Sequence, residues 1–375
     1  MGDTDAGIGE VATLFAPDYA TSRQRFREAA AALGATLEAY SIGERGPDGN
    51  DLTIDVAITP GIDAGRTLVI SSGLHGVEGF LGAAVQLGLL RAWHARGAGL
   101  PRVRCVLLHA LNPFGYAWRR RVNEANVDLN RNLLSAGESF NGSPAGYSQL
   151  NDLLNPLRAP SRGEPVTLKF LLAIARYGMP ALKQSIASGQ YDHPQGLFYG
   201  GDRPSRTHEI LSAHFDRWLG DSTRVMHLDF HTGLGAWATC KLLIDYPLSE
   251  LQRQRLSRCF GADAFECTHR PDLAYRTRGG FGQWCVARNR ERDYLYAAAE
   301  FGTYDPLRVL AGLRAENQAH HWGQPERPST ERAKQQLVEL FCPRAESWRT
   351  RVLQRGIQLV HRSINGLLEL PASNN

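Results

Sequence analysis

The sequence lacks the features of a membrane protein or a disulfide-rich secreted protein. None of its apolar runs approaches the roughly 20 residues that a membrane helix needs. The first residues, MGDTDAGIGEVATLF, contain no basic segment followed by an apolar one, unlike a signal peptide. Its six cysteines form no CxxC pair. We therefore expect a cytoplasmic protein with reduced thiols and no membrane partner, a bridge between Cys259 and Cys267 being the alternative.

A strong excess of charge of one sign is also lacking. The 375 residues include 42 basic and 38 acidic side chains, which gives a formal net charge of +4. A nucleic-acid-binding protein needs its basic residues clustered on one face. The densest basic run is short, Arg119 to Arg121, and we assign it below to a pocket. The composition therefore predicts no nucleic-acid partner.

Strand and helix signals alternate along the chain, which favours an α/β fold with a mixed central sheet flanked by helices. Apolar segments typical of strands are 67–72, 103–109, 224–230, 241–245 and 294–300. Segments typical of helices are 17–34, 79–96, about 166–188, 305–320 and 331–341. We expect residues 1–375 to form a single domain. An insertion at about 133–205 is expected over one face of the sheet, and a helical extension from about 305.

Chemically versatile side chains follow four of these expected strands. His75 and Glu78 come after the first, His231 directly follows 224–230, and Glu300 ends the last. An arginine- and asparagine-rich segment, 119–132, comes after 103–109. Ligands of open α/β sheets bind at the carboxyl ends of the strands. The sequence therefore predicts that these side chains line one crevice.

His75 and Glu78 have the spacing of a metal-binding pair, because three residues at a strand-to-helix transition let both reach one ion. Zinc binds histidine nitrogen and carboxylate oxygen, and its catalytic sites use three protein ligands. An isolated HxxE pair is equally explained by a loop histidine and a glutamate that stabilises a helix start. His231 supplies a third ligand of the correct type. Together they favour a site for one Zn²⁺ ion.

Five motifs together resemble the zinc metallocarboxypeptidase superfamily. They are His75-x-x-Glu78, Asn112-Pro113-Phe114-Gly115-Tyr116, Asp128-Leu129-Asn130-Arg131-Asn132, His231 and Glu300-Phe301-Gly302-Thr303. The superfamily includes the digestive carboxypeptidases and, more distantly, succinylglutamate desuccinylase and aspartoacylase. The motifs occur in the family's order and, with the first strand, span 67–303. The resemblance implies a zinc-carboxypeptidase-like (phosphorylase/hydrolase-like) fold and a cytoplasmic bacterial branch of the superfamily.

The resemblance also implies roles at the metal. His75, Glu78 and His231 would bind Zn²⁺, Asp128 would orient His75, and Glu300 would be the general base. Zinc lowers the pKa of a bound water towards ~7, and a nearby carboxylate takes the proton as the water attacks a carbonyl. Ligating histidines usually donate their second nitrogen to a partner such as Asp128. A buried ion pair for Glu300 and a turn cap for Asp128 are the alternatives.

Substrate-binding roles follow from the same resemblance. Asn130 and Arg131 match the pair that grips a terminal carboxylate, which the guanidinium fork binds through two hydrogen bonds. Arg121 is expected to stabilise the oxyanion of the tetrahedral intermediate, with Arg120 as the alternative. A solvated basic face is the other explanation of this run, and the one preferred for Arg119.

The sequence leaves alternatives open for the tyrosine over the substrate and for Asp229. The carboxypeptidases place a mobile tyrosine over the substrate, and Tyr275 is its best positional candidate, with Arg276 or Arg278 as alternative substrate contacts. Asp229 alternates with His231 on the same expected strand. It is an alternative supporting residue that we leave outside the predicted site.

These residues predict a zinc-dependent hydrolase that cleaves an amide bond next to a free carboxylate, in a peptide or small-molecule substrate. The alternative within zinc chemistry is an amidohydrolase or deacylase of small N-acyl amino acids. The alternative of another class is a non-catalytic binding protein on the same scaffold. Loss of Glu300 or of a zinc ligand would favour that last alternative, and neither is lost.

Overall fold

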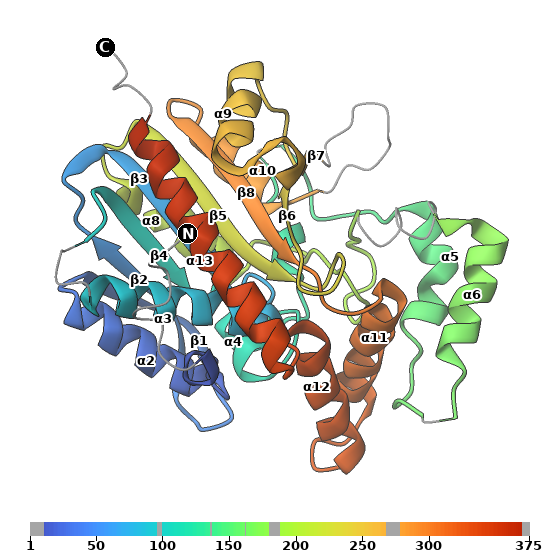
Figure 1. Cartoon of the computed structure of the whole chain (residues 1–375). Helices are drawn as coiled ribbons and strands as arrows, with labels where there is room; N and C mark the ends of the chain where they lie inside the picture. The colour runs from blue at the N-terminus through green and yellow to red at the C-terminus, as the bar shows by residue number, and fades with distance from the viewer. Residues whose placement is uncertain are drawn as a thin grey trace.

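A mixed eight-stranded sheet forms the centre of the structure, a computed structural model that describes residues 11–95, 100–135, 137–161, 163–179, 188–267 and 278–369 (Figure 1). The strand order is β1-β2-β4-β3-β5-β8-β6-β7. The strands are β1 (Thr36–Arg45), β2 (Asp51–Thr59), β3 (Asp63–Ser72), β4 (Val103–His109), β5 (Arg224–Thr232), β6 (Cys240–Ile244), β7 (Phe265–Cys267) and β8 (Asp293–Phe301). The predicted α/β class with a mixed sheet is confirmed.

The four central strands, β4, β3, β5 and β8, run parallel to one another. Their apolar runs reflect burial on both faces, as in other parallel sheets. The strand expected at 103–109 has those bounds as β4. On one side β1 and β2 pair antiparallel to each other and β2 pairs antiparallel to β4, whereas on the other side β6 pairs antiparallel to β8. The sequence did not predict the β1–β2 hairpin.

Helices cover both faces of the sheet. The longer ones are α2 (Tyr19–Ala32), α3 (Gly79–Ala95), α5 (Ala145–Leu154), α6 (Val166–Tyr177), α8 (Arg206–Leu219), α9 (Glu250–Phe260), α11 (Pro306–Trp322), α12 (Pro328–Phe341) and α13 (Glu346–Glu369). The shorter ones are α1 (Val11–Leu14), α4 (Pro113–Ala117), α10 (Phe281–Arg288) and the 3-10 turns η1 (Gly76–Glu78), η2 (Leu129–Arg131) and η3 (Ala262–Ala264).

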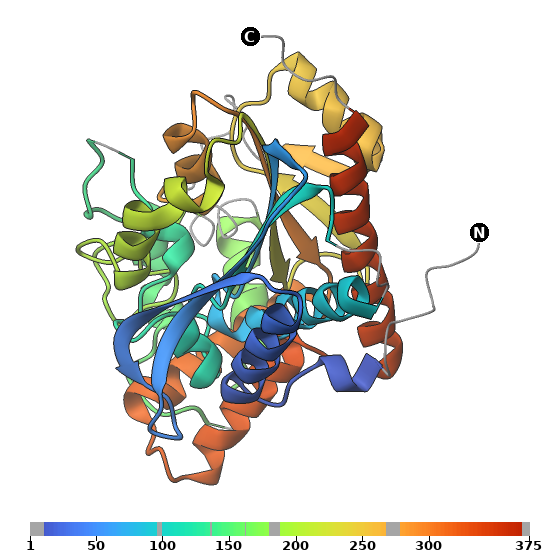
Figure 2. The same cartoon turned by 90° about the vertical axis from the view of Figure 1, so that its left-hand side faces the viewer.

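One face of the central strands packs against α3 and α13, which Figure 1 shows crossing the sheet. Gly82 of α3 must be glycine, because a Cβ there would lie 2.5 Å from the Cβ of Ser72. The opposite face packs against α8 and α10, where the ring centroid of Phe215 lies 6.2 Å from that of His227 and 5.7 Å from that of Trp284. The view in Figure 2 shows the same layers from the side. Ser72 therefore faces α3, whereas the neighbouring Ser71 points to the opposite face.

The region at 133–205 differs from the expectation that it covers a face of the sheet. Its two described helices, α5 and α6, lie beside α11 at the edge of the molecule (Figure 1). They share a second hydrophobic cluster with α11 and α12, which includes Tyr147, Phe170 and Leu313. Residues 190–200 instead return towards η2. Within the described residues, no helix combines the length and apolar character needed to cross a membrane.

Candidate metal centre

The His75–Glu78 motif lies on the tight connection between β3 and α3. Gly73 has a φ of +68°, and the turn η1 then brings His75 and Glu78 to the same side. A Cβ at Gly76 would lie 2.1 Å from the carbonyl carbon of Gly115, so only glycine fits. The Gly76 N–H also donates to the Arg121 carbonyl at 3.1 Å. Two of the resembling motifs therefore hold each other in place through their backbones.

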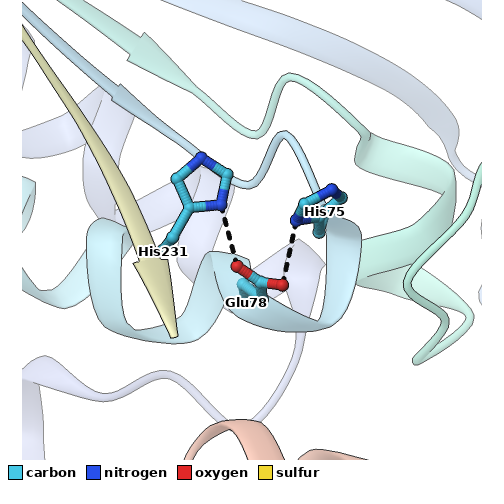
Figure 3. A group of neighbouring side chains, drawn as sticks. All are labelled: His75, Glu78 and His231. Atoms are coloured by element: carbon cyan, nitrogen blue, oxygen red, sulfur yellow. Dashed lines mark hydrogen bonds and ion pairs between the residues drawn. The ribbon is translucent and has the colours of Figure 1, made fainter. Parts of the chain in front are cut away.

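His75, Glu78 and His231 converge as a buried triad (Figure 3). His75 Nδ1 lies 2.9 Å from Glu78 Oε1, and His231 Nδ1 lies 3.0 Å from Glu78 Oε2. One candidate ligand atom from each residue lies within 4.8 Å of the other two. His231 reaches the group from the end of β5, so the sheet joins ligands that are 153 residues apart.

A carboxylate holds the second nitrogen of each histidine. His75 Nε2 lies 3.0 Å from Asp128 Oδ1, and His231 Nε2 lies 2.7 Å from Asp229 Oδ2. Both aspartates are fully buried. The position of Asp128 therefore agrees with the role that the resemblance implies. Asp229, left outside the predicted site, holds the equivalent position for His231.

Interactions with neighbouring groups outweigh the effect of burial on the pKa values of Glu78 and His231. Burial by itself raises the pKa of Glu78, but the two histidines hold this pKa below its usual range. Burial by itself lowers the pKa of His231, but Asp229 and Glu78 raise it well above its usual value. The buried carboxylates therefore stay ionised, which is the state that binds a metal.

Glu300 lies at the end of β8, paired with His231 of β5. Its side chain is 9 % exposed, and its Oε1 accepts the Leu234 N–H at 2.9 Å. Burial, and then the negative charge of Glu78, raise the pKa of Glu300 to about 7. A carboxylate with a pKa near neutrality binds a proton readily enough to act as a base.

The structure brings Arg121 to the triad and takes Arg120 away from it. Arg121 Nη1 lies 2.9 Å from Glu78 Oε1, and its Nε lies 3.2 Å from Asp128 Oδ2. Arg120 is fully buried on the other side, where its Nε donates to Glu316 Oε1 at 3.0 Å. Successive side chains point in opposite directions here, so Arg120 is not placed to contact a substrate at the metal centre.

Asn130 and Arg131 lie on η2, which begins directly after Asp128, the partner of His75. Asn130 Oδ1 accepts the Phe281 N–H at 2.9 Å, which leaves its Nδ2 as a donor. Arg131 Nη1 donates to the Asn130 carbonyl at 2.6 Å, and its Nε is buried without a hydrogen-bond partner among the described residues. Burial lowers the pKa of Arg131, partly offset by the charge of Asp128. Both residues therefore keep donors for an anionic group.

The remaining predicted positions are Tyr275, Arg276, Arg278 and Arg119. Tyr275 and Arg276 lie outside the described residues. Arg278 donates to the carbonyls of Ser139 and Asn141. Arg119 is half-exposed and forms a two-bonded ion pair with Glu331, as a residue on the surface would.

A family model described as "Protein of unknown function (DUF2817)" matches residues 15–355. The chain belongs to this family. The match includes every predicted site position from His75 to Glu300. Comparison with curated proteins found no match.

Solved structures similar to this DUF2817 chain include bovine thrombin-activatable fibrinolysis inhibitor in complex with tick carboxypeptidase inhibitor. That match has 12 % identity and a TM-score of 0.47, covering 93 % of this chain and 97 % of the other. Carboxypeptidase A from Helicoverpa armigera has 13 % identity and a TM-score of 0.43, and the match covers 86 % of this chain and 73 % of the other. Murein-tripeptide amidase MpaA from Escherichia coli O157 has 19 % identity and a TM-score of 0.39, and the match covers 77 % of this chain and 95 % of the other. These TM-scores are below 0.5, so the function of the DUF2817 chain is inferred from its own residues.

The triad of this DUF2817 chain fits zinc. Two imidazole nitrogens and a carboxylate oxygen are zinc donors, and three protein ligands leave a position open. His75 Nδ1 is buried without a hydrogen bond of good geometry, although Glu78 Oε1 is close. The carboxylates on both Nε2 atoms leave the Nδ1 atoms facing Glu78. Ligand type, burial and the second partners therefore all suit this ion.

Two supporting groups of this DUF2817 chain lie outside the predicted site. The sequence indicates Asp229 only as an alternative supporting residue, on its i, i+2 spacing to His231, since such residues share one face of a strand. The Leu234 N–H that holds Glu300 leaves no signal in side-chain types, because any residue except proline supplies it.

Proposed function

We propose that this chain is a zinc-dependent hydrolase that cleaves an amide bond next to a free carboxylate. The main support for this proposal is the convergence of His75, Glu78 and His231 beside Glu300 at the carboxyl edge of the sheet. His75 and Glu78 follow β3, His231 lies at the end of β5, and Glu300 lies at the end of β8, so three strand ends contribute to the group. A purely structural ion-pair cluster would not need three ligand atoms facing one point.

Zn²⁺ held by the triad would lower the pKa of a water molecule and polarise the scissile carbonyl. Glu300 would take the proton released as the water attacks, on Oε2, since Oε1 accepts the Leu234 N–H. The same carboxyl group would then hand that proton to the leaving amine. Its raised pKa supports both steps, because the carboxyl group can hold a proton near neutral pH.

Arg121 would stabilise the negative charge that develops on the carbonyl oxygen, because its guanidinium already lies among the triad. Asn130 Nδ2 and the guanidinium of Arg131 would bind the carboxylate of the substrate. A free carboxylate next to the scissile amide satisfies these donors in a C-terminal peptide and in an N-acyl amino acid. These donors therefore suit both kinds of substrate.

Metal analysis and one substitution test the proposal. The purified protein should hold one zinc per chain, and chelation should abolish hydrolysis until zinc is returned. Glu300→Gln should keep the zinc and the fold but lose about 10²- to 10⁴-fold in kcat. The surface control Glu331→Gln should match the wild type. Absence of stoichiometric zinc together with an active Glu300→Gln variant would overturn the proposal.

A substrate panel separates the two substrate classes. Dipeptides with free or amidated C-termini are compared with N-acetyl and N-succinyl amino acids. Turnover of free-acid dipeptides identifies a peptidase, and turnover of N-acyl amino acids alone identifies a deacylase. Amidated substrates should be poor in either case. Binding of the free acids without turnover, by zinc-loaded protein, would contradict the proposal and identify a binding protein.

A further inference from the structure

The two histidines of the triad each have a carboxylate partner, whereas the predicted site included only one, Asp128, and Arg121 Nη2 also lies 2.8 Å from His75 Nε2. Each imidazole directs Nδ1 to Glu78 and Nε2 to a buried aspartate. Asp229 and His231 come from the same strand, β5, two residues apart. Their contact is therefore built into the backbone of the sheet and needs no loop to close.

Hydroxyl groups from the two neighbouring strands fix Asp229. Ser71 Oγ of β3 donates to Asp229 Oδ1 at 2.6 Å, and Tyr296 OH of β8 donates to Oδ2 at 2.9 Å. Ser71 pairs in register with Asp229 across the sheet. His227 Nε2 lies 2.7 Å from the same Ser71 Oγ. The carboxylate is thus held from both sides in one orientation.

A buried carboxylate at the centre of a sheet is costly unless its charge is used or paired. The described residues that bond to Asp229 are Ser71, Tyr296 and His231, with no arginine or lysine among them. Asp128 differs, because Arg121 donates to its second oxygen. The charge of Asp229 is therefore directed mainly at the His231 imidazole.

We propose that Asp229 is the positioning residue of His231, keeping its Nε2 protonated so that the Nδ1 lone pair faces the metal. This inference rests on the proposed zinc centre. A carboxylate at that position also makes the imidazole a stronger donor to a metal. Because Arg121 shares the charge of Asp128, Asp229 should contribute more to zinc affinity than Asp128 does.

Zinc affinity, measured by competition with a chromogenic chelator, tests this role without reference to activity. Asp229→Asn should weaken zinc binding about 10- to 100-fold. Asp128→Asn should weaken it less, and Tyr296→Phe should weaken it by a smaller, measurable factor. Asp55→Asn is the matched control. Asp55, in β2, is also a fully buried carboxylate, and it pairs with Arg23 of α2. It should cost stability and leave the zinc Kd unchanged.

The outcomes separate the two proposals. A wild-type chain that binds no zinc would overturn both. A wild type that binds zinc, with a folded Asp229→Asn variant of unchanged Kd, would overturn only the role of Asp229. If Asp229→Asn does not fold, Tyr296→Phe decides, and an unchanged Kd there overturns the role. If Asp55→Asn also weakens zinc binding, by the same factor as Asp229→Asn, the effect of Asp229 is structural and its role as a positioning residue is overturned.

Discussion

Two clusters of charged side chains, which include the sequence neighbours Arg120 and Arg121, differ in how their atoms are arranged. The first, called the metal cluster because it contains the proposed zinc ligands, consists of the side chains of His75, Glu78 and His231 with Asp128, Asp229, Arg121 and Glu300. The arginine cluster consists of Arg120, Asn126, Glu316, Asn317 and Lys334. In the arginine cluster, Glu316 Oε1 accepts from Arg120 Nε at 3.0 Å and from Lys334 Nζ at 2.9 Å. In the metal cluster, two imidazoles converge on one carboxylate.

The difference lies in which atoms face each other. Cations surround the carboxylate of Glu316, so the arginine cluster is an ion-pair network that joins α11 and α12 to the segment after α4. The ligand atoms of the metal cluster can each give a lone pair to one ion. Burial and charge alone therefore do not distinguish the two clusters, whereas convergent donors with oriented second partners are what a metal site requires.

Breaking the arginine cluster should give the largest effect, on stability alone. Glu316→Gln leaves the buried Arg120 and the half-buried Lys334 without their anion, which should cost about 3–5 kcal/mol of unfolding free energy. Chemical denaturation measures this loss. The half-exposed pair of Arg119 is the control, and Glu331→Gln should cost at most about 1 kcal/mol. A large fall in kcat per folded Glu316→Gln molecule would contradict the separation of the clusters.

Substitution of Arg121 should lower kcat, whereas substitution of its neighbour Arg120 should lower stability. Arg121→Lys keeps a positive charge but loses the fork, so kcat should fall about 10²- to 10³-fold with the zinc content retained. Arg120→Lys should lower the thermal midpoint and leave kcat unchanged. Steady-state kinetics and thermal unfolding of both variants check this. Equal kcat losses in the two variants would mean that the structure assigns these neighbours wrongly.

His227, beneath the metal cluster, should make stability dependent on pH. Burial lowers its pKa to about 4, from an ordinary value of 6.5. The unfolded chain takes up a proton below about pH 6.5, whereas folded His227 stays neutral. Its contribution is therefore present above pH 6.5 and lost as the pH falls towards 4, on the order of 3 kcal/mol. Denaturation at pH 7 and 5 should show a smaller drop for His227→Gln than for the exposed control His94→Gln.

Arg131 should show the smallest effect, limited to substrates with a carboxylate. Arg131→Lys replaces two-bonded recognition by a point charge, so kcat/KM for free-acid substrates should fall about 10- to 100-fold. The rate for amidated analogues should not change, which makes them the internal control. A uniform loss on both substrate types would instead indicate a displaced metal centre, and the zinc content would reveal this.

Much of the fold follows from local pattern. The apolar run of β4 and the helical spacing of α3 predict those elements within one residue at each end, because burial and periodicity are encoded locally. The β1–β2 hairpin escaped prediction because β1 is mostly exposed or half-buried without a clean alternation, and the buried strand β2 carries the polar residues Thr53, Asp55 and Thr59. The α5–α6 region escaped for another reason, since its apolar positions do not say which surface they cover.

The sequence by itself determined which residues could bind a metal and where each sits along its strand, since residue type and strand ends are local properties. His75, Glu78, His231 and Glu300 were therefore predictable. Only the tertiary structure decided that Arg121 and not Arg120 faces the metal cluster. It also decided that Asp229 holds His231, because the partner of a side chain depends on strand register. Ser71 and Asp229, 158 residues apart, meet only when β3 and β5 pair.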